Sequence, residues 1–314
     1  MKQLKKKIFI CASVFVFLLS FFFLLHSSAF QVKQVKIEDT LPVVEPDYNW
    51  KSLDRNAAPE LNSKLEKYIM ENKRWKALAG DKKLAVGLVD LSDIHNPRTA
   101  WINGNVMMYA ASLPKIGVLL AAVKAIDSGE LKETPQIYND LNDMIRKSDN
   151  LATTRIIDRL SLEKIGETLS APEFRFFDKD NGGGIWVGKR YATDGAILPD
   201  PLNGLSHAAT VSQTCRFYYL LATGRLISAD RSKQMLDILS RPYLHHKFVN
   251  SLMNKYPLNR IYRKSGTWHS WHSDSVLVWG EDNNSRYILV ALVEDPNGEK
   301  ILRELAPIAE KVLQ

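Results

Sequence analysis

Two residues that could act as a nucleophile and its base, Ser112 and Lys115, stand three positions apart in an S-x-x-K motif. An apolar run at 116–126 follows, so the motif is expected at the start of a helix, where residues three apart share a face. A helix N-terminus favours an alkoxide and disfavours a protonated amine. These are the conditions that activate a serine for covalent catalysis. The same spacing also fits a capped helix with a solvated lysine, so the pair alone does not establish an active site.

Two further motifs follow along the chain. Ser148-Asp149-Asn150 lies between segments with the apolar spacing of helices, and Lys264-Ser265-Gly266-Thr267 lies in a run, 259–268, that predicts a strand. Each motif is common by itself. All three in this order, on a helix, an inter-helix turn and a strand, form a strongly specific combination.

The elements that must position these motifs can be predicted from periodicity. Helical spacing or an apolar run predicts helices at 59–78, 116–126, 210–223, 229–239 and at the C-terminus up to residue 313. Strands are predicted at 83–91, 99–109, 259–268, 275–279 and 287–293. Residues 171–207 lack periodicity and predict a long functional loop. The expected architecture is α+β, with one antiparallel sheet built from both chain ends, flanking helices and a helical lobe from the middle.

The three motifs resemble those of the class A β-lactamases and, more widely, the penicillin-binding proteins, over roughly residues 55–314. The resemblance implies a β-lactamase/transpeptidase-like fold and an acyl-enzyme mechanism at Ser112 on β-lactam or related amide bonds. Lys115 would be the base, and Ser148 would pass a proton to the leaving nitrogen. The backbone N–H groups of Ser112 and Thr267 would form the oxyanion hole.

The resemblance also implies the substrate-binding residues, which are Asn150, Lys264, Ser265 and Thr267. Asn150 would hydrogen-bond the substrate's side-chain amide, whereas Lys264 and Thr267 would hold its carboxylate. The substrate would be a small molecule or a peptide, β-lactam or peptidoglycan-like, and neither a metal nor another cofactor is expected.

Two departures from the class A pattern affect the expected activity. Class A enzymes carry E-x-x-L-N, whose glutamate activates the water that breaks the acyl-enzyme. Here Leu202-Asn203 is present, but Pro199 replaces the glutamate and Asp200 is one position off. Other carboxylates that could substitute are Glu173, Asp178, Asp180 and Asp194. The 36 residues from Ser112 to Ser148 are fewer than is typical, so the helical lobe is expected to have lost a segment.

Three activities therefore remain open. The first is hydrolysis of β-lactams or related amides. The second is a D-alanyl-D-alanine-type peptidase acting on cell-wall peptides, with Lys115 serving both half-reactions. The third is a penicillin-binding sensor or scavenger that is acylated without turnover, which the missing glutamate would favour.

The N-terminus predicts export. A basic start at 1–7 precedes an apolar run at 8–25 and the small residues Ser27 and Ala29, so 1–29 is a signal peptide or an uncleaved anchor. Residues 30–54 are expected to be a linker, and 55–314 the catalytic domain, in the periplasm or another extracytoplasmic space, with 8–25 as a possible inner-membrane anchor. The net charge is +7, but four lysines of the leader contribute to it, and the remainder is too mildly basic to indicate nucleic-acid binding. The sequence does not predict the oligomeric state.

Overall fold

The computed structural model describes residues 40–44, 50–53, 58–192 and 194–314, which belong to one compact unit that begins at Thr40. The predicted leader, including the apolar run at 8–25, and the first part of the predicted linker lie outside the described residues. No helix within the described ranges is both long enough and apolar enough to cross a bilayer.

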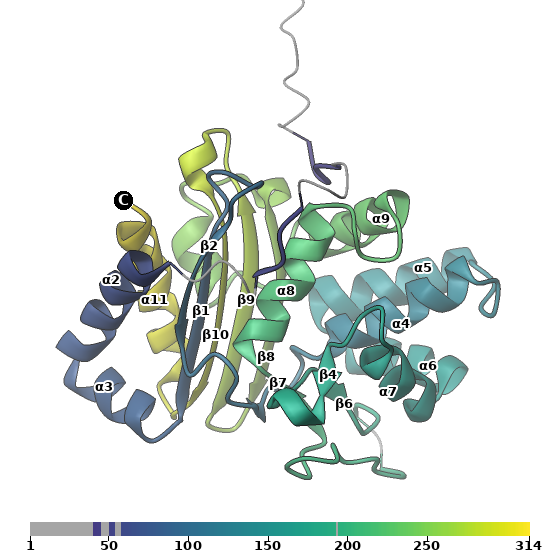
Figure 1. The fold of residues 1–314 in the computed structure, drawn as a ribbon. Helices are drawn as coiled ribbons and strands as arrows, with labels where there is room; N and C mark the ends of the chain where they lie inside the picture. Colours follow the sequence, from purple (N-terminus) through teal and green to yellow (C-terminus); the bar gives the residue numbers. More distant parts are fainter. Residues whose placement is uncertain (1–39, 45–49, 54–57, 193) are drawn as a thin grey trace, which may run out of the picture. The chain divides into compact units, whose positions relative to one another are not determined.

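The centre of this unit is a five-stranded antiparallel sheet of order β2-β1-β10-β9-β8 (Figure 1). Its strands are β1 (Leu84–Asp90), β2 (Arg98–Ile102), β8 (Ile261–Trp268), β9 (Trp271–Trp279) and β10 (Arg286–Glu294). Strand β1 pairs along its whole length with β10, so the two ends of the chain complete one sheet. The predicted α+β class, with one antiparallel sheet built from both chain ends, is confirmed.

The sheet buries both of its faces because its strands are apolar on both sides. In β1, Leu84, Val86 and Leu88 belong to one hydrophobic cluster, and Ala85 and Val89 to another. The period of two in a strand sends these sets to opposite faces. The first face is covered by α2 (Pro59–Glu71), α3 (Lys73–Gly80), α10 (Phe248–Leu252) and α11 (Gly298–Leu313). Helix α8 (Val211–Ala222) covers the other face (Figure 1).

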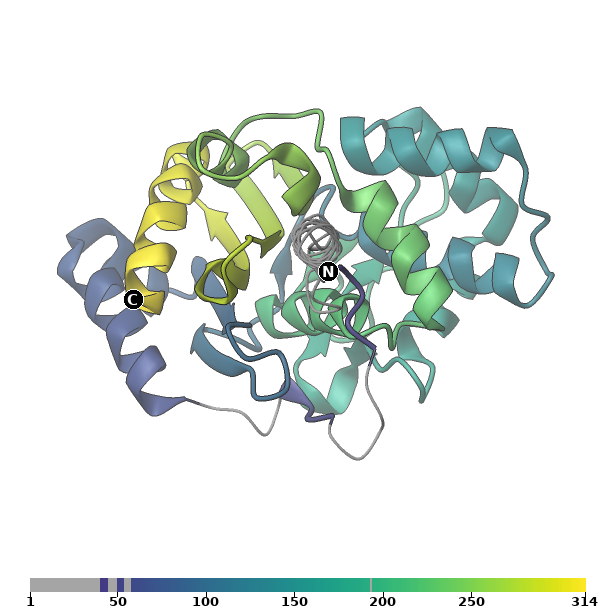
Figure 2. The ribbon, with the colours of Figure 1, turned by 90° about the horizontal axis from the view of Figure 1, so that it is seen from above.

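The helical lobe lies beyond α8, on the side away from α2 and α11 (Figure 2). It contains α4 (Lys115–Asp127), α5 (Pro135–Asn142), α6 (Asn150–Leu160), α7 (Leu162–Ser170) and α9 (Ala229–Leu239). Every residue of α4 except Lys124 and Asp127 is buried, as the apolar run predicted. A helix buried all round is a rigid support for the motif at its N-terminus.

Residues 171–207 contain more regular structure than the sequence predicted. Short strands β4 (Phe177–Asp178) and β5 (Gly183–Gly184) pair with each other, and β6 (Trp186–Val187) joins β7 (His207–Ala209) and β3 (Met108–Tyr109) in a small sheet. The predicted strand at 99–109 is thus divided between two sheets. Two- and three-residue strands are too short for periodicity to detect.

Part of the predicted linker packs on the core. Val43 donates its backbone N–H to Ala222 O at 2.7 Å, and Leu53 is buried. Two apolar residues without periodic neighbours give no sequence signal for this contact.

Candidate active site

Ser112 lies in a tight turn between β3 and α4, because the helix begins at Lys115 rather than at the serine. The preceding residue, Ala111, has a φ of +50°, in the left-handed region that residues with a β-carbon rarely adopt. The hydroxyl of Tyr191 donates to Ala111 O at 3.1 Å and helps to hold this conformation. Such strained turns expose the residue that follows them and gather at functional sites.

Gly266 lets strand β8 approach this turn. A β-carbon at Gly266 would lie 2.3 Å from Ala110 O and 2.6 Å from the backbone nitrogen of Ser112. Only a hydrogen fits in that space. The resemblance assigns the oxyanion hole to the backbone N–H groups of Ser112 and of Thr267, the next residue of β8, and this close approach brings together the two segments that carry them.

Lys115 is completely buried and its amine is directed at the Ser148 motif. Nζ donates to Ser148 O at 2.7 Å and to Asn150 Oδ1 at 2.8 Å, with Ser148 Oγ at 3.5 Å. Burial lowers the pKa of Lys115 to about 7, although the nearby charge of Asp149 opposes the shift. A neutral amine has two hydrogens and one lone pair, so these two oxygens can take both hydrogens and leave the lone pair to accept a proton.

The Ser112 hydroxyl makes no hydrogen bond to any of the described residues, Lys115 included. The expected contact between nucleophile and base is therefore not formed in this state. Catalytic hydrogen bonds are often long in free enzymes and tighten when substrate binds.

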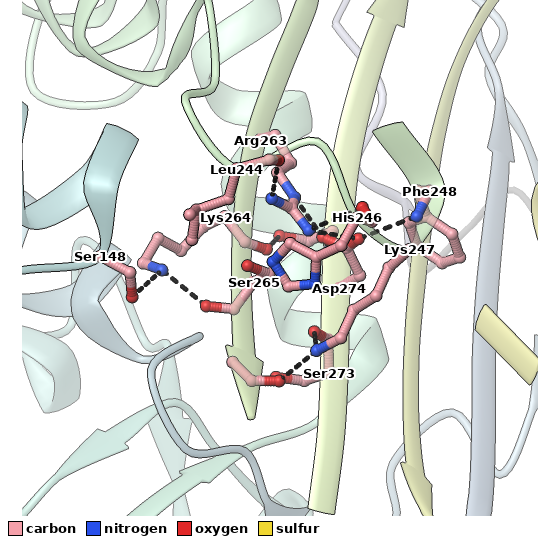
Figure 3. A network of polar contacts seen from close by, with 12 residues as sticks. Ser148, Leu244, His246, Lys247, Phe248, Arg263, Lys264, Ser265, Ser273 and Asp274 are labelled. Carbon is pink, nitrogen blue, oxygen red and sulfur yellow. Dashed lines mark hydrogen bonds and ion pairs between the residues drawn. The ribbon is translucent and has the colours of Figure 1, made fainter. Parts of the chain in front are cut away.

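Ser148 joins two lysines. The backbone of Ser148 adopts a left-handed φ of +60°. The Ser148 hydroxyl accepts a hydrogen bond from Lys264 Nζ at 2.9 Å (Figure 3). Lys264 also donates to Ser265 O at 2.6 Å. Burial, followed by the positive charge of Lys115, lowers the pKa of Lys264 well below its usual value. A hydroxyl that accepts from one lysine keeps its own hydrogen free to donate to a leaving group.

A third buried lysine, Lys247, was not singled out from the sequence. Its Nζ donates to Thr267 Oγ1 at 2.7 Å and to Gly266 O at 2.6 Å, and burial lowers its pKa to about 7. Because the Thr267 oxygen accepts from Lys247, its hydroxyl hydrogen is free to be donated to another acceptor. Lys247 lies in an irregular segment with a backbone φ of +56°, and no sequence pattern predicts a functional lysine at such a position.

A buried ion pair holds the segment that carries Lys247. Arg263 donates to Asp274 through Nε at 2.7 Å and Nη2 at 2.9 Å (Figure 3). The same guanidinium donates to Leu244 O, and the Asp274 carboxylate accepts from the backbone N–H of Phe248. Both charged side chains are almost fully buried, so each depends on the other.

A cavity of about 660 Å³ contains Ser112 in its lining. Asn150 and Thr267, two of the predicted substrate-binding residues, also line it. Lys115 and Lys264 are buried behind the surface, and Ser148 connects them. Ser265 is only 4% exposed and is absent from the lining, so its observed role is to hold Lys264 through its carbonyl oxygen.

The cavity wall from residues 189–192, 194 and 206–207 was not predicted in detail. His207 is buried, with Nε2 donating to Lys189 O at 3.1 Å, and burial lowers its pKa to about 4. Its ring lies 4.2 Å from that of Tyr191, and Lys115 Nζ lies 4.6 Å from the Tyr191 ring centroid. A neutral histidine and an aromatic ring therefore line this side of the nucleophile.

Asp200, the carboxylate nearest to the missing glutamate in sequence, organises its own loop. It is 2% exposed and accepts hydrogen bonds from the backbone N–H groups of Leu202, Asn203 and Leu205 at 2.5–2.8 Å. It does not line the cavity. Its oxygens are therefore occupied by the backbone of its own loop. Of the other carboxylates considered as substitutes, only Asp194 lines the cavity with Ser112.

Among the described residues, no group of three or more His, Cys, Asp or Glu side chains could hold a metal ion.

Comparison with known proteins identifies the class. The model of the beta-lactamase enzyme family matches residues 133–314, which is more than half of the chain. The chain therefore belongs to this family. The match includes the Ser148 and Lys264 motifs, but it begins after Ser112 and Lys115. No curated protein matches the sequence.

Solved structures show the same fold at low identity. A β-lactamase from Sphaerobacter thermophilus is 17% identical with a TM-score of 0.58, covering 80% of this chain and 95% of that one. A structure of PBP-A is 19% identical with a TM-score of 0.58, covering 87% and 98%. A point mutant of PBP-A, solved as an acyl-enzyme complex with penicillin G, is 19% identical with a TM-score of 0.59, covering 82% and 97%.

Proposed function

We propose that this protein is an exported serine hydrolase that is acylated at Ser112 by β-lactams or by related amides that carry a carboxylate. The observation that supports this best is the buried amine of Lys115, with a pKa lowered to about 7 and two of its hydrogens held by Ser148 O and Asn150 Oδ1. A lysine that loses its proton near neutral pH, three residues from a serine in an S-x-x-K motif, can act as the general base for that serine.

The acylation step follows from this arrangement. Ser112 Oγ attacks the amide carbonyl carbon and gives its proton to Lys115 Nζ. The N–H groups of Ser112 and Thr267 stabilise the oxyanion. The carbon–nitrogen bond then breaks as Ser148 donates its hydroxyl proton to the leaving nitrogen and recovers one from Lys115, whose Nζ lies 3.5 Å from Ser148 Oγ. The serine proton thus ends on the leaving group, and Lys115 is neutral again.

Release of the acyl group is expected to be slow with β-lactams. The Asp200 carboxylate is held by its own loop, and His207 bonds Lys189 O through Nε2 and Ser206 Oγ through Nδ1. Lys115, which already serves as the base in the proposed acylation step, would therefore also have to activate the water. The leaving amine of a peptide substrate departs from the site after acylation. Water or another amine can then enter and be activated by Lys115. This is the D-alanyl peptidase alternative.

A second candidate is a β-lactamase with efficient turnover in which Asp194 activates the water. It is favoured by one observation, that Asp194 lines the same cavity as Ser112. Asp194 is exposed, so it would have to turn inward after acylation.

The test uses a fluorescent penicillin for labelling and nitrocefin for turnover. We expect stable labelling of the wild type, none of Ser112→Ala, and normal labelling of Ser128→Ala, an exposed serine at the other end of α4. Nitrocefin turnover should be slow and unchanged in Asp194→Asn. Rapid turnover that falls at least tenfold in Asp194→Asn would establish the second candidate instead. An unlabelled wild type would overturn the proposal.

Export is part of the proposal and rests on the apolar run at 8–25. N-terminal sequencing of the protein recovered from the envelope distinguishes cleavage before Phe30 from a retained anchor. A leader that leaves the protein in the cytoplasm would contradict export.

A further inference from the structure

The cavity that contains Ser112 also holds an uncompensated cation, Lys189. Within the described ranges, its side chain makes no hydrogen bond or ion pair. The neighbouring Arg190 lines the same cavity but donates Nε to Asp158 Oδ1 at 2.5 Å. The two adjacent cations therefore differ, because Arg190 is paired with a carboxylate and Lys189 is not.

The backbone fixes the place from which this cation extends. Lys189 O accepts the hydrogen bond from His207 Nε2, and Lys189 pairs with Ile197 in an isolated β-bridge. The preceding glycine, Gly188, donates to Ser206 O at 2.6 Å. Lys189 is half-buried, so its ammonium is less hydrated than that of a surface lysine.

The rest of the lining leaves Lys189 as the cation suited to an anion on this wall. His207 stays neutral, since its pKa is lowered to about 4 by burial and by the charges of Lys115 and Lys189. The one carboxylate of the lining, Asp194, forms no ion pair with Lys189 in the described structure. The same cavity also has apolar surface, because the rings of Tyr109 and Trp271 pack edge to face with centroids 5.8 Å apart and both residues line it.

The carboxylate subsite already described belongs to a different part of the fold. Thr267 and Lys264 stand on β8 of the large sheet, whereas Lys189 follows β6 of the small sheet. Ser112 lines the cavity together with Thr267 and Lys189. An acyl substrate bound at Ser112 has two ends, its leaving side and its acyl side, so Thr267 would meet one end and Lys189 the other.

We propose that Lys189 is a specificity residue that binds a carboxylate on the acyl side of the substrate, with an apolar stem against Tyr109 and Trp271. The preferred substrate class is then an amide with two carboxylates, one on each side of the bond that is cleaved. This inference rests on the proposed acylation at Ser112, and its test has one arm that does not.

Two penicillins form a matched pair of probes. Carbenicillin differs from benzylpenicillin by one carboxylate on the side-chain carbon next to the amide carbonyl, on the acyl side. The second-order acylation rate constants of both are measured by competition with a fluorescent penicillin, using the full-length protein. The variants are Lys189→Met and, as the matched control, Arg190→Met. The quantity compared between variants is the acylation rate constant for carbenicillin divided by that for benzylpenicillin.

The ratio should fall about fivefold in Lys189→Met, as for loss of one partly solvated ion pair. It should stay within twofold in Arg190→Met, and 0.5 M salt should reduce the wild-type ratio, because exposed charges are screened. An unchanged ratio in Lys189→Met, or an equal fall in both variants, would overturn the inference.

The second arm measures equilibrium binding of the two penicillins to Ser112→Ala, and to that variant combined with Lys189→Met, by quenching of tryptophan fluorescence. Trp268 and Trp271 both line the cavity and report on its occupancy. A carbenicillin preference that depends on Lys189 here supports the inference even if no penicillin acylates the wild type. Its absence refutes the inference even if acylation occurs.

Discussion

Replacing Gly266 with alanine should separate the two halves of the oxyanion hole. The added methyl would lie 2.6 Å from the Ser112 backbone nitrogen and 2.3 Å from Ala110 O, where carbon contacts normally begin near about 3.5 Å. Strand β8 and the Ser112 turn must therefore move apart by about 1 Å. No left-handed φ is involved at Gly266, so the effect is steric alone.

A shift of this size removes at least one oxyanion donor from hydrogen-bond distance, because such donors act at about 2.7–3.1 Å. Loss of one donor costs about 3 kcal/mol, which corresponds to a rate about 10²-fold lower. The measurement is the acylation rate constant with benzylpenicillin, from the mass of the intact protein over time. Thermal unfolding shows whether the variant remains folded.

The matched control is Gly80→Ala at the exposed end of α3, where a β-carbon would meet nothing within 4 Å. It should acylate at the wild-type rate. A Gly266→Ala rate within threefold of the wild type would refute the reasoning that β8 and the Ser112 turn are in direct contact.

Two further predictions concern buried charges. Acylation should rise about tenfold per pH unit up to pH 7 and level off above it, because Lys115, with its pKa lowered to about 7, accepts a proton only when neutral; a rate that is flat from pH 5.5 to 8.5 would exclude Lys115 as the base. Asp274→Asn should lower the free energy of unfolding by about 3–5 kcal/mol by leaving Arg263 buried without its partner. Chemical denaturation would check this, with Asp143→Asn, an exposed partner of Lys147, as a control expected to lose less than about 1 kcal/mol.

Much of the fold was predictable because its elements carry long periodic signals. The terminal helix, the buried α4 run and all five strands of the large sheet were located from apolar spacing to within a few residues, although β2 was merged with β3. The helix predicted at 59–78 is divided at Asn72, whose side chain accepts from the backbone N–H groups of Arg74 and Trp75 and starts a new helix. A cap inside an apolar pattern of continuous period is easily overlooked.

The site was predictable only where its residues lie in motifs. Ser112, Ser148 and Lys264 were found because each belongs to a short pattern whose order along the chain is specific. Lys247 was missed because it acts through contacts with segments distant in sequence, and Lys189 was missed because it belongs to no motif and only the folded cavity places it in one lining with Ser112. Asp200 shows the converse, because its position beside Leu202-Asn203 suggested a base, whereas three backbone N–H groups occupy its carboxylate.

The sequence by itself determined the chemistry available to this protein. It supplies Ser112, the motif residues Lys115, Ser148 and Lys264, and apolar elements that can bury them. The tertiary structure decided the state of those groups. Burial makes Lys115 a weak acid with a pKa of about 7, and the lack of a side chain at Gly266 lets strand β8 lie against the Ser112 turn. The physical reason is that desolvation and backbone separation depend on residues far apart in the chain, which no local pattern records.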